Sequence, residues 1–187
     1  HPPLHTYYLG WFYTLGEKLR SHNVGFALHV LSQMLVLAVV FAYIIYDLRQ
    51  NGCNAIWCIA LFAIFGFFPV HSLLAISCTK DILFSGFFVL SAYQIYRLWF
   101  APELARKLGF VIRLFLFMVL ACLFRHNFCY GLFLFLPFAF VFAKPGTRLQ
   151  TGLVIVMCCV CSFASYQVVK SAYRDGAVES REMLSIP

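Results

Sequence analysis

Residues Val24–Tyr46, VGFALHVLSQMLVLAVVFAYIIY, form an apolar run without a single Lys, Arg, Asp or Glu. A helix of about 20 such residues is long enough to cross the hydrocarbon core of a bilayer. The rest of the chain has the same character, with 63% hydrophobic and 11% charged residues. Soluble domains contain roughly 45–50% and about 25% of these classes. A soluble core of this size cannot bury so much apolar surface, so we expect an integral membrane protein.

Five further apolar runs follow, and short polar connectors separate them. Together with the first run they predict six spans, at about residues 24–46, 55–70, 82–100, 105–124, 128–143 and 152–169. The fourth and fifth runs are short, and only Arg125-His126-Asn127 lies between them. They form either two short spans, the interpretation that we favour, or one re-entrant hairpin. A membrane tolerates a re-entrant hairpin only where protein covers its backbone.

The first residues have a different pattern. Apolar and aromatic side chains recur there at helical spacing, with polar ones between them: Leu4, Tyr8, Trp11, Phe12, Leu15 and Leu19. Aromatic side chains favour the depth of the lipid headgroups, so we expect residues 4–19 to form a helix lying flat in the interface. The predicted fold class is therefore an all-α, polytopic integral membrane helical bundle with one interfacial amphipathic helix. Because the chain starts at His1 and not at Met, we expect a piece of a longer protein.

The polar segments fall into two sets that alternate along the chain. One set comprises Asp47–Asn54, Arg97–Leu108 and Lys144–Thr151. The other comprises residues 1–22, 71–81, 125–127 and the tail 170–187. The first set carries six Lys and Arg residues, whereas the internal segments of the second carry only Lys80 and Arg125. Because Lys and Arg are enriched on the cytoplasmic side, the second set is predicted to be extracytoplasmic. Its His, Lys, Asp, Arg and Asn residues are typical of a membrane-embedded active site.

Lys80 and Asp81, at the start of the third span, are the most specific candidate pair of ionisable residues. An acid in the first turn of a helix is favoured by the helix dipole, so capping alone would explain Asp81. A carboxylate and an ammonium at the end of a membrane-spanning helix also suit proton abstraction and phosphate binding. The sequence leaves both interpretations open. Asp81 is the candidate catalytic residue, and Lys80 is a candidate substrate-binding residue.

Arg125 and Asn127 lie between the fourth and fifth predicted spans, on the same predicted side of the membrane. A guanidinium can fork onto a phosphate or a carboxylate, or it can anchor a helix end at the interface. His1 and His5 flank a Pro-Pro pair, and two His residues without a nearby acid make a weak metal site. We therefore predict that these four residues bind substrate and that none ligates a metal. The cofactor stays unknown; a divalent metal is an option that the sequence does not indicate.

Small and polar residues share one face of the first span: His22, Gly25, His29, Ser32 and Gln33. Such groups usually face the bundle and hydrogen-bond a neighbouring helix; lining a substrate cavity is the alternative. Gly25 would let another helix or a lipid tail approach closely.

Two other classes of site are excluded. The formal charge of +7 does not indicate nucleic-acid binding, because the basic residues are scattered among the connectors. Cys158 and Cys161 have the C-x-x-C spacing but lie in an apolar run. They predict helix packing and not a redox or zinc site, which needs access from outside the hydrocarbon.

Three short motifs, in order and spacing, resemble a known family over the whole chain. His1-Pro2-Pro3-Leu4-His5-Thr6 and the aromatic stretch after it resemble the first extracytoplasmic loop of GT-C glycosyltransferases, in particular bacterial relatives of protein O-mannosyltransferases and lipopolysaccharide-core transferases. The likeness is strongest to a group of largely uncharacterised Gram-positive membrane proteins. These share the His-Pro…His-Thr opening, a Ser-x-Thr-Lys-Asp stretch matched by Ser77–Asp81, and a Leu-Ser-Ile-Pro run matched by Leu184–Pro187.

The resemblance implies transfer of a sugar from a polyprenyl-phosphate-linked donor to an acceptor hydroxyl at the outer face of a bacterial plasma membrane. By motif position, Lys80 and Asp81 fall in a second outer loop that binds phosphate or acceptor, and His1 and His5 fall at the end of the first. The first-loop acid of the family precedes the His-Pro run, so the resemblance implies that this stretch alone is inactive. The expected partners are membrane lipids and the lipid-linked donor; no protein partner is indicated.

The alternative function is a transporter or flippase-like protein for lipid-linked sugars or small solutes, without catalysis. Transporters place ionisable groups near the middle of the membrane and show repeated halves. In this chain the charges gather at one predicted face and no repeat is visible, which favours the enzyme. A third option is a scaffold subunit in which Lys80, Asp81 and Arg125 only anchor helix ends.

Overall fold

The computed structural model describes residues 3–68, 73, 75–77 and 79–184, and these form helices without a β-strand among them. The helices are α1 (Pro3–Lys18), α2 (His22–Gln50), α3 (Ala55–Phe67), α5 (Lys80–Phe100), η1 (Pro102–Arg106), α6 (Leu108–Phe124), α7 (Asn127–Val141) and α8 (Arg148–Leu184). All are α-helices except η1, which is a short 3-10 helix. The prediction of an all-α protein is confirmed.

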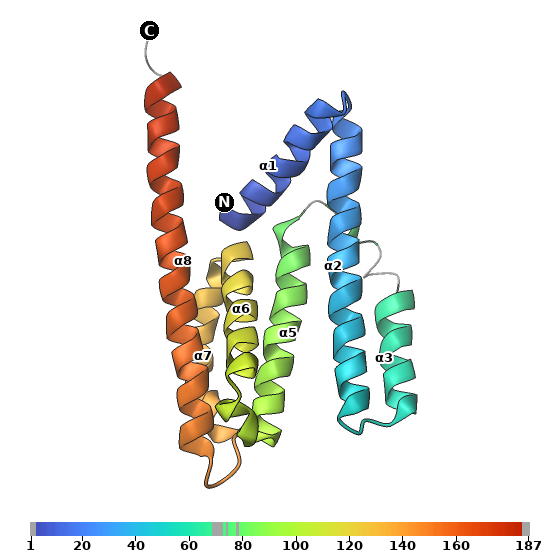
Figure 1. The fold of residues 1–187 in the computed structure, drawn as a ribbon, viewed down its shortest axis with the longest axis vertical. Helices are drawn as coiled ribbons and strands as arrows, with labels where there is room; N and C mark the ends of the chain where they lie inside the picture. The colour runs from blue at the N-terminus through green and yellow to red at the C-terminus, as the bar shows by residue number, and fades with distance from the viewer. Residues whose placement is uncertain (1–2, 69–72, 74, 78, 185–187) are drawn as a thin grey trace.

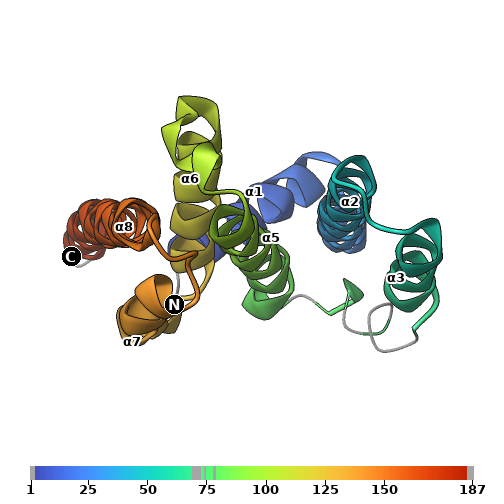
Figure 2. The ribbon, with the colours of Figure 1, turned by 90° about the horizontal axis from the view of Figure 1, so that it is seen from below.

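The axes of α2, α3, α5, α6, α7 and α8 are roughly parallel or antiparallel to one another, and α1 crosses one end of them (Figure 1). In Figure 1, α1 passes obliquely above α5 and α6 and turns back into the upper end of α2. Seen from below, α2 and α3 lie on one side, α5 and α6 in the middle, and α7 and α8 on the other side (Figure 2). The middle pair joins the two sides, because α5 packs on α2 and α6 packs on α8.

The main core surrounds α6. Three of its side chains, Phe110, Leu114 and Met118, are almost completely buried among residues of α5, α7 and α8. A smaller buried cluster joins α2 to α5 and comprises Val40, Ile44 and Leu90. The α5–α8 part of the bundle therefore has the more extensive interior, and α2 is attached to it along one face.

The outer surface of the bundle is apolar, whereas several polar side chains are buried. Large hydrophobic side chains that face outward occur on each of the long helices, for example Val39, Ile56, Phe88, Leu116, Leu134 and Met157. Almost fully buried polar side chains are His29, Gln33, Ser91, Gln94, Thr151 and Ser162. Soluble proteins seldom expose so much contiguous apolar surface. Among the described helices, α2 and the Arg148–Tyr173 part of α8 are long and apolar enough to cross a membrane.

Two helices have other boundaries than predicted, and a proline explains the first difference. The second apolar run was expected to reach residue 70, but α3 ends at Phe67 and Phe68 has extended backbone. Pro69 follows, and the residue before a proline avoids the helical region. The fourth run was expected to start at residue 105, but Pro102 begins η1 and α6 starts only at Leu108. Both helices are consequently shorter than the predicted spans.

The last helix is longer than predicted. Its expected span covered residues 152–169, followed by a separate tail at 170–187. In the structure α8 begins at Arg148 and continues without a break to Leu184, so most of the expected tail extends the same helix. The segment from Lys170 to Leu184 contains no proline that would end the helix.

The Arg125–His126 turn separates two helices that run in opposite directions along α8 (Figure 1). They are α6, with 17 residues, and α7, with 15. At 1.5 Å per residue, such helices are about 22–26 Å long. This is less than the roughly 30 Å of a typical hydrocarbon core. That α6 and α7 each cross the membrane therefore stays a prediction.

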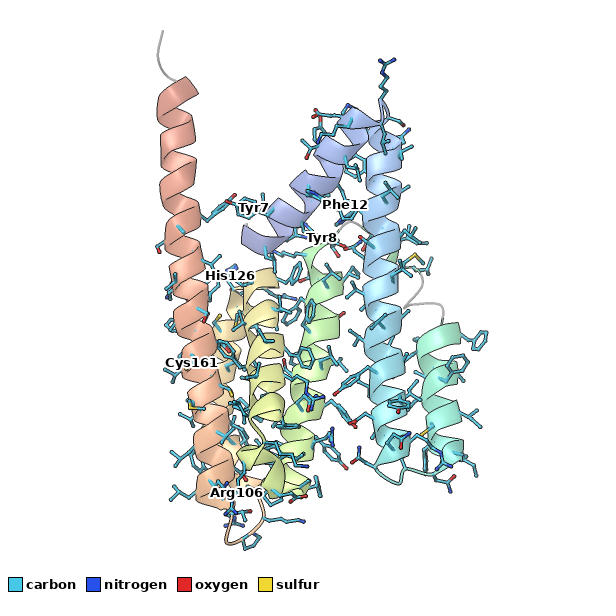
Figure 3. All side chains as sticks on the ribbon, in the orientation of Figure 1. Tyr7, Tyr8, Phe12, Arg106, His126 and Cys161 are labelled. Carbon is cyan, nitrogen blue, oxygen red and sulfur yellow. The ribbon has the colours of Figure 1, made fainter. Side chains whose placement is uncertain are left out.

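The described residues of the two predicted sets of polar segments lie at opposite ends of the bundle. His126 lies at the end beside α1, and Arg106 lies at the other end (Figure 3). The starts of α5 and α7 share the α1 end, which we call the capped end (Figure 1). We call the other end, where α2, α5 and η1 finish, the open end. The alternation of the polar segments therefore predicts their arrangement correctly; the side of a membrane on which each end lies stays a prediction.

Candidate functional site

Two glycines allow α1 to cover the capped end. In the hairpin between α1 and α2, a Cβ added to Gly25 would lie 2.5 Å from the carbonyl oxygen of Phe12 and 3.0 Å from the Cα of Gly16. The turn between the helices contains Arg20, which has a positive φ of 56°. The prediction that Gly25 lets another helix approach closely is confirmed, and the helix is α1. At its other end α1 reaches α8, where Tyr7 meets Tyr173 edge to face at 5.5 Å.

The side chains of α1 enclose His29 of α2. The ring of Tyr8 lies 4.9 Å from the His29 ring, and the ring of Phe12 lies 5.5 Å from it. Tyr8 also shares a short hydrogen bond with the hydroxyl of Ser32. Figure 3 shows Tyr8 and Phe12 between α1 and α2. His29 is completely buried, and neither ring nitrogen has a hydrogen-bond partner among the described residues.

The polar face of α2 is used for helix packing, as predicted. Gly25, His29 and Gln33 are its buried small and polar residues. The amide of Gln33 donates to the carbonyl oxygen of Ser77 at 3.2 Å, so this face also holds the segment that precedes α5. Of the two interpretations of this face, contact with neighbouring segments accounts for Gly25, Ser32 and Gln33.

An ion pair joins two of the predicted site residues. Arg125, which follows the last turn of α6, donates from Nη1 to Oδ1 of Asp81 at 2.8 Å. Asp81 stands in the first turn of α5, where the helix dipole also favours a carboxylate. The guanidinium lies 5.3 Å from the ring centre of Phe84. Both side chains are about half exposed, at 42% for Arg125 and 48% for Asp81, so a ligand can reach them.

His5 belongs to the same group of charges. Partial burial lowers its pKa below the usual value, the charge of Lys80 lowers the pKa further, and the charge of Asp81 acts in the opposite direction. The Nδ1 atom of His5 is buried and has no partner among the described residues. Its ring lies 6.3 Å from that of His29. An imidazole with a lowered pKa is mostly neutral at pH 7, so it can donate one hydrogen bond and accept another.

The structure thus brings together four of the six predicted site residues: Lys80, Asp81, Arg125 and His5. Asn127 begins α7 at the same end and is exposed. His1 lies outside the described residues. Sequence reasoning missed the pairing of Asp81 with Arg125 and the enclosure of His29 by Tyr8. The helical spacing of Tyr8 and Phe12 was a signal for the enclosure of His29, although this spacing was interpreted as contact with lipid.

No group of three or more His, Cys, Asp or Glu side chains within the described ranges could hold a metal ion. His5 and His29 are a facing pair, but two ligands fall short of the three protein ligands of a typical catalytic zinc site. The described residues of the capped end offer an ion pair, the carboxylate of Asp81 and hydrogen-bonding side chains.

The open end holds a second and more buried ion pair. Asp47, in the last turn of α2, lies 2.7 Å from Nη1 of Arg97 in the last turn of α5. The side chains are only 18% and 17% exposed, respectively. Tyr93 donates a further hydrogen bond to Asp47 at 2.6 Å. The sequence indicated only a topological role for the basic residues of this end, so this network is a new feature.

No matching family model, curated protein or solved structure is found for the chain. The resemblance to GT-C glycosyltransferases therefore rests on the short motifs alone.

Proposed function

We propose that the chain is part of a polytopic membrane glycosyltransferase. It would move a sugar from a polyprenyl-phosphate-linked donor to an acceptor hydroxyl at the capped end, on the extracytoplasmic face. The observation that carries the proposal is the half-exposed ion pair of Asp81 and Arg125, with Lys80 and His5 beside it. The apolar outer surface of the bundle supports a membrane location, because a polyprenyl tail could stay in lipid while its phosphate meets these charges. The order of the GT-C-like motifs supports the reaction.

Arg125 and Lys80 are the proposed phosphate ligands. Only Nη1 of Arg125 is bound to Asp81, and a guanidinium carries five N–H donors in a planar fork. The donor phosphodiester has two non-bridging oxygens and one negative charge, so it could bind two N–H groups of this fork in place of the single contact with Asp81, and it gains further charge when the sugar leaves. Lys80, at the start of α5, would add a second positive charge. Binding of the donor would then release Asp81 for chemistry.

In the proposed reaction the acceptor oxygen forms a bond to the anomeric carbon of the sugar. The bond from that carbon to the phosphate oxygen breaks, and its electron pair stays on the phosphate, where Arg125 and Lys80 stabilise the charge. The proton of the acceptor hydroxyl passes to the released carboxylate of Asp81. His5 would orient the donor or the acceptor through its buried Nδ1 atom. Asn127 and His1 stay candidate substrate-binding residues.

The test compares phosphate-lipid binding with turnover in the whole protein that contains this chain. Asp81→Asn is expected to bind polyprenyl phosphate at least as tightly as the wild type, because Arg125 loses its competing partner. Its rate of transfer should fall by about 10²- to 10⁴-fold, the usual contribution of a general acid or base. Lys80→Gln and Arg125→Gln should instead weaken binding by about tenfold or more, since each removes a charge-assisted hydrogen bond.

Lys18→Gln is the matched control, because Lys18 is an exposed cation in the last turn of α1. It should change neither binding nor turnover. If Asp81 acted only through the dipole of α5, whose N-cap is Thr79, Asp81→Asn would cost roughly 0.3–1 kcal/mol of stability and leave the turnover of the folded protein unchanged. Wild-type turnover of purified Asp81→Asn would therefore remove Asp81 from the reaction. Unchanged phosphate binding by both cation variants would remove the proposed phosphate site.

A transporter is the second candidate, and the buried polar side chains of α2 favour it. His29 and Gln33 lie within a helix long enough to span a membrane, and His29 has both ring nitrogens without a partner among the described residues. Transporters use such groups along substrate or proton paths. In proteoliposomes, a transporter would move a labelled lipid-linked sugar across the bilayer without forming a new glycosidic bond, and His29→Phe would stop that movement. Formation of a glycosylated product would favour the transferase.

A further inference from the structure

The open end contains a cavity of about 430 Å³ that the proposed transferase site does not use. It lies where the last turns of α2 and α5 meet the beginning of α6. The cavity is lined by Asp47, Arg97, Leu104, Lys107, Gly109, Phe110 and Arg113. Three of these side chains are cations and one is a carboxylate, so the lining has an excess of positive charge.

The carboxylate in this wall is already neutralised. Asp47 pairs with Arg97 at 2.7 Å and accepts a hydrogen bond from the hydroxyl of Tyr93 at 2.6 Å. Arg97 is held in addition by Asn51, whose side-chain oxygen lies 3.4 Å from Nη2, and it lies over the ring of Phe110. These contacts fix one wall of the cavity. They also leave Asp47 little capacity to attract the remaining cations or to repel an anion.

The other two cations have no acidic partner in the part of the chain that the structure describes. Lys107 forms no ion pair among the described residues, and Arg113 donates only to the carbonyl oxygen of Gly109 in its own helix, at 3.2 Å. Both side chains are exposed. They flank the start of α6, where the helix dipole is positive. The N–H of Phe110 already donates to the carbonyl oxygen of Lys107 at 2.8 Å, so the N–H groups of Leu108 and Gly109 are the ones that lack a partner within the helix. A Cβ added to Gly109 would meet no atom within 4 Å, so the backbone there is accessible.

We propose that this cavity binds a phosphate group, carried either by the headgroup of an anionic phospholipid or by a soluble anion. A guanidinium, an ammonium and accessible helix N–H groups together match the charge and the acceptor oxygens of a phosphate. The position also suits a headgroup. Exposed apolar side chains of α6, such as Ile112 and Leu116, begin immediately beyond the cavity and could contact acyl chains. Basic pockets between helices on the cytoplasmic side commonly bind anionic headgroups, and the distribution of Lys and Arg predicts this end to be cytoplasmic.

Native mass spectrometry and thermal unfolding of the purified protein in neutral detergent test the proposal. The probes are phosphatidic acid, phosphatidylcholine and inorganic phosphate, each added separately at increasing concentration. The wild type is expected to retain phosphatidic acid in preference to phosphatidylcholine and to melt at a higher temperature with it. The double variant Lys107→Gln/Arg113→Gln should bind phosphatidic acid about tenfold more weakly or worse.

Arg106→Gln is the matched control, because Arg106 is an exposed cation at the same end but does not line the cavity. It should bind like the wild type. A rise in melting temperature with inorganic phosphate would identify a soluble anion as a ligand, and a response to phosphatidic acid alone would identify the lipid headgroup. Equal binding by the double variant and the wild type, or an equal loss in Arg106→Gln, would overturn the proposal. So would the lack of any response to both phosphate probes.

The single variant Lys107→Gln keeps the test valid if the double variant does not fold. Lys107 is exposed and precedes α6, so its replacement should leave the bundle intact. A correctly folded single variant should show weaker retention of phosphatidic acid than Arg106→Gln does. Matching retention in these two variants would also overturn the proposal.

Discussion

Replacing Gly25 by Ala tests whether direct backbone contact holds α1 over the capped end. The new Cβ would lie 2.5 Å from the carbonyl oxygen of Phe12 and 3.0 Å from the Cα of Gly16. Both neighbours are backbone atoms, so no change of rotamer can relieve the clash. Because Cβ contacts below 3.0 Å are essentially never observed, α1 has to move away from α2 by about 0.5–0.9 Å. This movement would loosen the packing of Tyr8 and Phe12 on His29.

The expected magnitude follows from two opposing effects. Overpacking a close contact costs about 1–3 kcal/mol. Ala is favoured over Gly inside a helix by roughly 1 kcal/mol, which offsets part of this cost. We therefore expect Gly25→Ala to lower the free energy of unfolding by about 0–2 kcal/mol.

Gly10→Ala is the matched control, because Gly10 also lies in a helix of this hairpin but a Cβ there meets no atom within 4 Å. This variant should be as stable as the wild type or more stable by up to roughly 1 kcal/mol. Thermal unfolding of the three proteins in one detergent gives the comparison. A melting temperature for Gly25→Ala equal to or above that of Gly10→Ala would refute the close contact between α1 and α2.

Two further predictions concern the open end and His5. Tyr93→Phe removes a hydrogen bond to the carboxylate of Asp47 and should lower the free energy of unfolding by about 1–3 kcal/mol. Tyr96→Phe, which alters an exposed ring, should change it by less than about 0.5 kcal/mol. Equal melting temperatures for the two variants would contradict the hydrogen bond between Tyr93 and Asp47. Because the pKa of His5 is lowered in the folded protein, the unfolded chain binds its proton more tightly, and stability should fall as pH drops below the unfolded value of about 6.5. His5→Gln should reduce that dependence in melting curves recorded between about pH 7 and pH 5, and identical slopes for the two proteins would count against it.

The apolar runs were enough to predict the helices. A long run such as Val24–Tyr46 has no favourable conformation in an apolar environment except one that satisfies every backbone group within the segment. The end of α3 was less accurate because Phe68 precedes Pro69, and a proline restricts the residue before it however apolar its neighbours are. The start of α6 was less accurate because η1 and the extended backbone of Lys107 precede it. The extension of α8 beyond Lys170 was missed because this segment contains no apolar run to mark it.

The sequence also predicted which residues gather at the capped end. Each apolar run carries the chain from one end of the bundle to the other, so every second connector must lie at the same end. This argument needs no knowledge of packing, and it placed His5, Lys80, Asp81 and Arg125 in one region. The close approach of α1 was likewise foreseeable at Gly25, since only a residue without a side chain permits it.

The pairing of individual side chains was decided by the tertiary structure. Asp81 and Arg125 meet because the start of α5 lies against the end of α6, and Asp47 meets Arg97 because α2 and α5 finish side by side. The rotation of each helix about its axis determines which of several nearby charges come within hydrogen-bond distance. That rotation depends on how side chains such as Met118 and Leu90 fill the interior. The apolar runs and their alternation with polar segments therefore determined the helices and the end at which each polar group lies. Packing between residues far apart in the chain determined which of those groups touch.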